Sequence, residues 1–130
     1  MKIDHIGYAV KNIEKSINEF RKLGYVFDDV IEDNKRNVYI CFGCLDGYRV
    51  ELISPLDKNK PSPVDNYVKG NGNTPYHICY KTNNFNETIE ELKKQKFMTV
   101  IEPEEACAFG GKRVVFMFNS GIGLLEIAEE

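Results

Sequence analysis

Two things are missing from this sequence: an excess of basic residues and a long apolar run. Its 17 lysine and arginine residues are outnumbered by 20 aspartate and glutamate residues, which gives a formal net charge of −3. A weakly acidic chain has no positive field for a polyanion, so we expect no nucleic-acid partner. No stretch approaches the about 18 apolar residues of a membrane span, and Asp4 precedes any signal-peptide core. We therefore expect a cytoplasmic protein with no membrane partner.

Cysteine is too scarce here to indicate a disulfide scaffold. The chain has 130 residues, long enough to bury a core without such staples, and its four cysteines lie in apolar segments: Cys41, Cys44, Cys79 and Cys107. We expect reduced, buried thiols. Cys41 and Cys44 have the spacing of zinc and redox pairs, but there is no second pair, and this one ends a β-type run instead of opening a helix. A structural role is favoured.

What the sequence does contain is an internal duplication. The segment 3–10 (IDHIGYAV) returns as 75–82 (PYHICYKT), 72 positions later. The similarity continues without a gap at the same spacing. Residues of the same or a similar type recur 72 positions later: Asn12 as Asn84, Ile17 as Ile89 and Tyr25 as Phe97. Only two copies fit, each about half of the chain, so we predict two paired half-domains that share a core rather than a solenoid.

Hydrophobic periodicity predicts the same order of elements in each half. In the first half we predict strands at 2–10, 25–32, 38–42 and 49–53, with a helix over 13–23 capped by Asn12 and ended by Gly24. In the second half we predict strands at 76–82, 97–101, 113–118 and 123–128, with a helix over 84–95. Proline, glycine and polar residues mark 55–74 as a surface connection. The prediction is one α+β domain over 1–130, in which βαβββ modules at 1–54 and 75–130, joined by linker 55–74, pair into a half-open mixed β-barrel.

The only two histidines of the chain fall at matching places in the two modules. His5 and His77 lie near the start of the first predicted strand, and Glu51 and Glu126 lie within the fourth. An ionised glutamate among apolar strand neighbours is costly unless it is paired or binds a cation. If the strands close into a half-open barrel, two imidazoles and two carboxylates meet on its floor.

This set of nitrogen and oxygen ligands suits a divalent ion such as Ni²⁺, Co²⁺, Zn²⁺, Mn²⁺ or Fe²⁺. Four protein ligands of a six-coordinate ion leave two positions for water or substrate oxygens. We therefore predict a catalytic metal site made by His5, Glu51, His77 and Glu126. The alternative for each residue alone is a satisfied core histidine or a solvent-facing glutamate, which would not explain four matching positions.

These four residues, each in its βαβββ position, resemble the vicinal oxygen chelate (glyoxalase/bleomycin resistance/dioxygenase) superfamily. The resemblance covers nearly the whole chain. Segments 50–56 (VELISPL), 76–80 (YHICY) and 110–114 (GGKRV) look most like the methylmalonyl-CoA epimerase branch. The two-histidine, two-glutamate ligand set is similar to that of bacterial glyoxalase I, a lactoylglutathione lyase. We place the epimerase branch slightly ahead and keep glyoxalase I as the alternative.

The resemblance implies a metal-dependent isomerase or lyase that removes a proton from carbon beside a carbonyl. By position it implies Glu126 as the base, with Glu51 acting on the opposite face of the carbon, and a small thioester or thiohemiacetal as substrate. Lys112 or Arg113 would attract an anionic substrate, unless both are simply solvated charges at a strand entry. A homodimer is expected by resemblance alone.

Two rival functions follow from the same fold. Extradiol dioxygenases are similar in using two histidines, but with one carboxylate and in longer chains. A drug-sequestering protein would bind a small molecule without metal, and such binders commonly lack the four ligands. Stoichiometric metal in protein purified without chelator would disfavour the sequestering protein, and oxygen consumption with a catechol would favour the dioxygenase.

Overall fold

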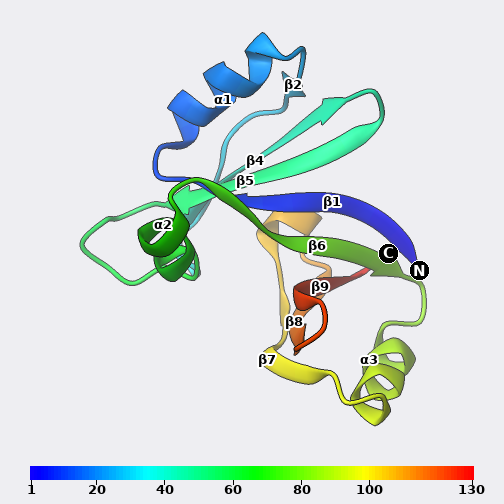
Figure 1. Ribbon diagram of the computed structural model, residues 1–130. Helices are drawn as coiled ribbons and strands as arrows, with labels where there is room; N and C mark the ends of the chain where they lie inside the picture. Colours follow the sequence, from blue (N-terminus) through cyan, green and yellow to red (C-terminus); the bar gives the residue numbers. More distant parts are fainter. The chain divides into compact units, whose positions relative to one another are not determined.

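Both predicted βαβββ repeats are present in the computed structural model, which describes residues 1–130. The first repeat consists of β1 (Lys2–Ala9), α1 (Ile13–Lys22), β2 (Val26–Phe27), β3 (Ile31–Asp33), β4 (Val38–Leu45) and β5 (Tyr48–Pro55). Helix α2 (Asp65–Asn71) lies in the connection. The second repeat consists of β6 (Thr74–Thr82), α3 (Phe85–Lys94), β7 (Met98–Glu105), the short 3₁₀ helix η1 (Cys107–Phe109), β8 (Arg113–Asn119) and β9 (Gly123–Glu129) (Figure 1). The predicted α+β class with two βαβββ modules is confirmed.

By its internal contacts the chain divides into two compact units. The N-terminal unit is His5–Tyr76, and the C-terminal unit is His77–Glu130 together with Met1–Asp4. The first four residues are tied to the C-terminal unit by two ion pairs, Lys2 with Glu130 at 2.9 Å and Asp4 with Lys81 at 3.2 Å. The single-domain organisation stays a prediction.

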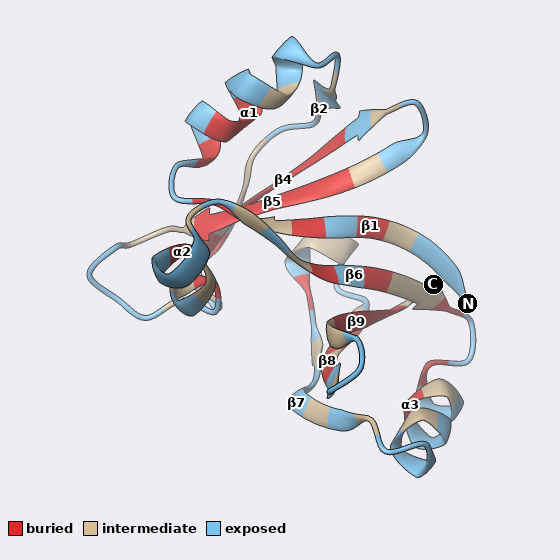
Figure 2. Ribbon diagram, viewed as in Figure 1, coloured by how far each residue is buried: buried red, intermediate tan, exposed pale blue.

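The sheet of the N-terminal unit has the strand order β2-β4-β5-β1, with β3 paired to β4. Strand β5 is antiparallel to β4 and parallel to β1. Its backbone is therefore bonded on both edges, and its residues from Val50 to Ser54 are all buried (Figure 2). A strand covered on both faces carries a continuous apolar run, and Glu51 is the one charged residue within it.

Helix α1 covers one face of this sheet. Its apolar stripe, which includes Ile13 and Ile17, packs in one core cluster with Cys41, Val50 and Leu52. Side chains alternate along a strand, so the β5 residues on either side of Val50 and Leu52 lie on the opposite face of the sheet. That opposite face holds Glu51.

The C-terminal unit repeats this plan with the strand order β6-β9-β8-β7. Strand β9 is parallel to β6 and antiparallel to β8. Helix α3 covers one face through Phe85 and Ile89, which pack with Met117 and Ile127. Glu126, next to Ile127, again lies on the face away from the helix.

Three local predictions were wrong. The strand predicted at 25–32 is two short strands, β2 and β3. The strand predicted at 97–101 is longer, because β7 continues to Glu105 across two register shifts. None of the four cysteines is in a disulfide, as expected, but Cys44 and Cys107 are exposed rather than buried. None of the helices combines the length and the apolar character that crossing a membrane requires.

Candidate metal centre

The first candidate pair, His5 and Glu51, lies on neighbouring parallel strands of the N-terminal unit. In the register of β1 and β5, Gly7 is the Cα partner of Glu51. His5 is two residues before Gly7, so alternation places it on the same face as Glu51, away from α1. The His5 Nε2 atom lies 3.3 Å from the Glu51 Oε1 atom. Local strand geometry alone therefore brings these two predicted ligands together.

The second pair, His77 and Glu126, repeats this geometry in the C-terminal unit. Cys79 is the Cα partner of Glu126 between β6 and β9, and His77 again stands two residues earlier. The His77 Nε2 atom lies 3.1 Å from the Glu126 Oε2 atom. The duplication seen in the sequence therefore gives the two units the same contact between a histidine Nε2 atom and a glutamate carboxylate oxygen.

All four side chains are deeply buried, with relative exposures of 1% for His5, 3% for Glu51, 3% for His77 and 2% for Glu126. Burying a carboxylate is unfavourable by several kcal/mol unless it is compensated, and a neutral imidazole compensates it only in part. A divalent cation would supply the missing positive charge. Imidazole nitrogen and carboxylate oxygen are ligands that Zn²⁺, Ni²⁺, Co²⁺, Mn²⁺ and Fe²⁺ accept, so the residues fit a metal of this kind.

Each histidine also has a phenylalanine against its ring, which the sequence reasoning missed. Phe42 is the Cα partner of Glu51 on β4, and its ring centroid lies 5.4 Å from that of His5 in an edge-on arrangement. Phe116 is the Cα partner of Glu126 on β8 and lies 5.3 Å from His77 in the same way. Such contacts hold an imidazole ring in a fixed plane. Only the strand register identifies both phenylalanines as neighbours of the histidines, so no local sequence signal pointed to them.

The two basic residues predicted to attract an anionic substrate have different environments. Arg113 is held by the structure, because its guanidinium donates to Glu129 at 2.9 Å and to Asn86 at 3.1 Å and stacks over the Phe85 ring. This favours a structural role for Arg113. Lys112 is exposed in the turn before β8.

A buried histidine–glutamate pair on each of two βαβββ modules defines a class of α+β protein with duplicated modules, each of which has side chains that could hold a metal. Comparison with known families agrees with this description: the sequence profile of the Glyoxalase/Bleomycin resistance protein/Dioxygenase superfamily matches residues 4–116. The chain belongs to this superfamily.

Its relatives in sequence include the mitochondrial methylmalonyl-CoA epimerases of Homo sapiens and Mus musculus. The human protein is 27% identical over 124 residues, which cover 94% of this chain and 69% of the relative. The mouse protein is 26% identical over 124 residues, 94% of this chain and 68% of the relative.

Solved structures show that the fold is shared. A hypothetical protein of Bacillus halodurans superposes with a TM-score of 0.87 at 25% identity, over 99% of this chain and 94% of that one. Methylmalonyl-CoA epimerase of Mycobacterium tuberculosis gives 0.84 at 19% identity, over 98% and 87%. The Streptomyces coelicolor epimerase in complex with 2-nitronate-propionyl-CoA gives 0.85 at 18% identity, over 100% and 94%. At identities of 18% and 19%, the likeness to the two epimerase structures shows a shared fold.

Proposed function

We propose that this chain is a divalent-metal-dependent epimerase that moves the proton on the carbon beside the carbonyl of an acyl-CoA thioester of the methylmalonyl-CoA type. The observation that carries the proposal is the repeated buried pair, His5 with Glu51 and His77 with Glu126. An epimerase needs a proton acceptor and a proton donor on opposite faces of one carbon. Two equivalent carboxylates on duplicated modules supply one group for each face, and the relatives in sequence are named as epimerases of this substrate.

In this proposal His5, Glu51, His77 and Glu126 together hold a single ion. When bound, the ion would polarise the carbonyl oxygen of the substrate and so lower the free energy of the negative charge that develops there. The two imidazoles serve as neutral ligands whose ring planes are set by Phe42 and Phe116. The glutamate that is ionised at a given stage supplies negative charge to the ion.

The carboxylates also carry the proton in this proposal. Glu126 starts as a carboxylate, takes the proton from one face of the substrate carbon and becomes a carboxylic acid. Glu51 starts as a carboxylic acid, gives its proton to the other face and becomes a carboxylate. Both groups return to their starting states by exchanging protons with solvent before the next turnover. The burial of both carboxylates also keeps bulk water away from the reacting carbon.

The experiment compares wild-type protein with Glu126→Gln and Glu51→Gln, each stripped of metal and reloaded with Co²⁺ or Ni²⁺. Methylmalonyl-CoA is incubated in deuterium oxide, and both label uptake at the reacting carbon and racemisation are followed. Each glutamine variant should lower the rate by roughly 100-fold or more while it still binds metal, because it cannot accept the proton. Wild-type rates in both variants would show that neither carboxylate takes part in the proton transfer.

The second candidate, lactoylglutathione lyase activity, is favoured by the ligand set itself, since two histidines and two glutamates are present. The same preparations are therefore assayed with the thiohemiacetal of methylglyoxal and glutathione. Turnover of the thiohemiacetal without turnover of methylmalonyl-CoA would replace the epimerase proposal with the lyase. A protein that takes up no metal and turns over neither substrate would support a sequestering function instead.

A further inference from the structure

A row of apolar side chains borders the His77–Glu126 pair on the C-terminal unit. Glu126 on β9 is the Cα partner of Phe116 on β8, and Phe116 is in turn the partner of Ile101 on β7. Cα partners in neighbouring strands point to the same face of a sheet, so these side chains form one row across three strands. The row lies on the face that holds His77, because the Phe116 ring contacts the His77 ring at 5.3 Å.

A second row lies beside the first on the same face. Leu124 on β9 is the partner of Phe118 on β8, and Phe118 is the partner of Met98 on β7. Leu124 stands two residues before Glu126, so the two rows are about 7 Å apart along the strands. Together the rows hold one carboxylate and five apolar side chains, which we call the apolar surface: Met98, Ile101, Phe116, Phe118 and Leu124.

Much of the apolar surface is open to solvent (Figure 2). Met98 is 66% exposed, Phe118 is 41% exposed and Ile101 is 38% exposed. Phe116 and Leu124 are partly buried. Exposed apolar side chains that gather next to a polar group are typical of a ligand-binding surface.

The first module shows that the fold does not require apolar residues here. Phe118 pairs with Leu124 one row away from Glu126, and the two residues that pair at the equivalent place in the first module are Cys44 and Arg49. Cysteine and arginine are therefore compatible with the same backbone positions. The apolar types in the second module call for a reason other than folding.

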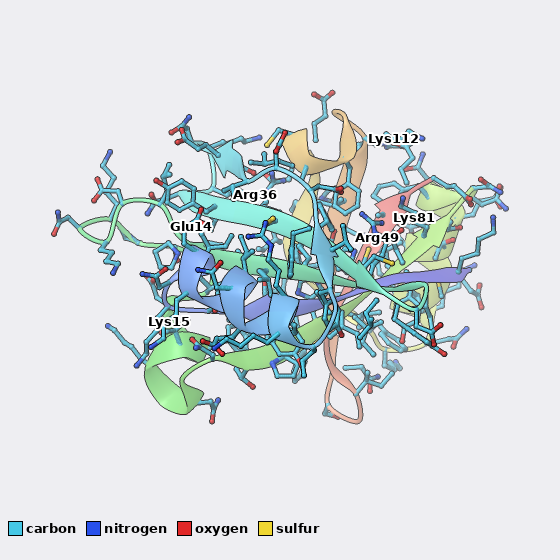
Figure 3. All side chains as sticks on the ribbon, turned by 90° about the horizontal axis from the view of Figure 1, so that it is seen from above. Glu14, Lys15, Arg36, Arg49, Lys81 and Lys112 are labelled. Atoms are coloured by element: carbon cyan, nitrogen blue, oxygen red, sulfur yellow. The ribbon has the colours of Figure 1, made fainter.

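On its other side, the His77–Glu126 pair is bordered by charged groups. Lys81, labelled in Figure 3, stands four residues after His77 on β6, so alternation places it on the same face. Its Nζ atom lies 3.2 Å from the Asp4 carboxylate. A ligand that contacts Glu126 therefore meets an ion pair on one side and apolar side chains on the other. Only the second side favours an apolar group.

The size and position of the apolar surface favour a small ligand over a second copy of the chain. A stable protein interface buries about 800 Å² on each partner, far more than five side chains provide when two are already partly buried. The row of Phe116 and Ile101 also ends at Glu126, so a protein laid over it would cover the carboxylate. A substrate group held at Glu126 contacts the same side chains and needs no larger area.

We infer that the apolar surface binds an alkyl or aryl group carried by the acyl part of the substrate, and so favours acyl thioesters with a larger apolar substituent. The inference rests on the proposed function, which brings the reacting carbon to Glu126, and deepens it by naming the substituent. Each row crosses three strands, so the surface is about 10 Å wide, enough for a chain of several carbons.

The test measures equilibrium binding of acetyl-CoA, butyryl-CoA and hexanoyl-CoA to the protein as purified. Wild-type affinity should rise about two- to four-fold for each added CH₂ group, the upper value corresponding to complete burial. Phe118→Thr keeps a residue that favours strands but removes the ring, so it should lower this gain to at most about 1.5-fold. Phe118→Leu should retain most of the gain. Met98→Thr repeats the test on β7.

Ile78→Thr is the matched control. Ile78 is 37% exposed and lies on β6 of the same unit, but its partner Leu125 places it on the face that carries α3. The control should keep the wild-type gain, and unchanged urea midpoints in all variants confirm that folding is intact. A wild-type affinity that does not depend on chain length would overturn the inference, as would a dependence that Phe118→Thr leaves unchanged.

Two further measurements separate this inference from the proposed function and from dimerisation. Racemisation of methylmalonyl-CoA in deuterium oxide without any dependence of binding on chain length would overturn the inference and leave the epimerase standing. Chain-length-dependent binding without label uptake would overturn the epimerase and support the apolar surface as a binding site. Sedimentation velocity tests the second copy: a wild-type dimer that Phe118→Thr dissociates, with no chain-length dependence, would assign the surface to a partner chain and overturn the inference.

Discussion

At the scale of single residues, the environment of Cys41 predicts an unreactive thiol. Cys41 is buried in the core under α1, and its sulfur donates to the Asp28 carbonyl oxygen at 3.1 Å. Burial, with a further contribution from the negative charge of Asp28, raises the pKa of Cys41 to about 11. Only the thiolate reacts with alkylating agents, so very little of Cys41 is reactive near neutral pH.

We therefore expect iodoacetamide at about pH 8 to modify the exposed Cys44 and Cys107 well before Cys41. Mass spectrometry of proteolytic peptides after timed quenching measures each site separately. Addition of urea should then bring the modification rate of Cys41 up to that of the other two, because unfolding removes the burial. Rapid labelling of Cys41 in the native protein would contradict this account of its environment.

The candidate ligands could be predicted from sequence, while their neighbours could not. Duplication marked His5 and His77, the only two histidines, and an isolated charge in an apolar strand marked Glu51 and Glu126. The neighbours depend on cross-strand register instead. Residues 42 and 51 become partners only because β4 and β5 pair with a particular offset, which no local pattern states.

At the scale of elements, the duplication provides its own control for helix capping. Asn12 and Asn84 occupy equivalent N-cap positions before α1 and α3. The Asn12 side chain accepts a hydrogen bond from the Lys15 backbone N–H at 3.0 Å, whereas the Asn84 side chain makes no cap hydrogen bond. The asparagine at this position should therefore contribute more to the free energy of unfolding in the first module than in the second.

We expect Asn12→Ala to lower the free energy of unfolding by about 1 kcal/mol, because it leaves one helix N–H without its acceptor. Asn84→Ala should lower the free energy of unfolding by clearly less than Asn12→Ala does. Urea denaturation followed by circular dichroism gives both values under one set of conditions. Equal losses in the two variants would show that the cap bond to Lys15 has no net effect.

A second element-scale feature is the clamp between the ends of β8 and β9. Arg113 donates to both carboxylate oxygens of Glu129, at 2.9 and 3.2 Å. The hydrogen bonds from Arg113 hold the pKa of Glu129 below its usual value of 4.5. Since the folded-state pKa is the lower one, this stabilisation is fully present above pH 4.5 and is lost as the pH falls through the lowered value.

We expect a carboxyl NMR titration to show Glu129 titrating below its ordinary range, and Arg113→Leu should return it to that range. Lys112→Leu is a suitable control, because it removes a neighbouring charge that makes no hydrogen bond to Glu129. Since the clamp is exposed, any accompanying change in stability should be small. A Glu129 titration that Arg113→Leu leaves unmoved would exclude the clamp as the cause.

Element types were predictable, and element ends were less so. The helix over 13–23 was placed well, because Asn12 and Gly24 are local signals, and Gly24 does adopt the left-handed conformation with φ +105°. The far end of β7 was missed, because two register shifts against β8 allow the strand to continue past Pro103. Such irregularities depend on the partner strand rather than on the segment itself.

At the scale of the whole molecule, the duplication divides the proposed centre between the two compact units. Each unit supplies one histidine and one glutamate that already face each other, so each resembles half of a four-ligand site. Two outcomes can be told apart by stoichiometry. Either the halves serve one ion, as we propose, or each binds its own ion weakly with two ligands.

The proposed single site predicts one Co²⁺ or Ni²⁺ per chain in protein purified without chelator. Since loss of a group that merely supports a ligand costs about 10- to 100-fold in metal affinity, His5→Ala and His77→Ala should each weaken binding by at least that factor. Metal binding should also raise the Tm of the wild-type protein, because the ion binds only the folded chain. Metal titration followed by elemental analysis measures the stoichiometry, and thermal unfolding with and without chelator measures the Tm.

Independent half-sites would give a different pattern in the same titration. Wild-type protein would then take up two ions, and each single variant would keep one with unchanged affinity. The shared site instead requires that a substitution on either unit removes the only tight ion, since ligands from both are needed to complete its coordination. Equal losses from His5→Ala and His77→Ala, which lie in different units, would therefore show that the two modules act on one ion.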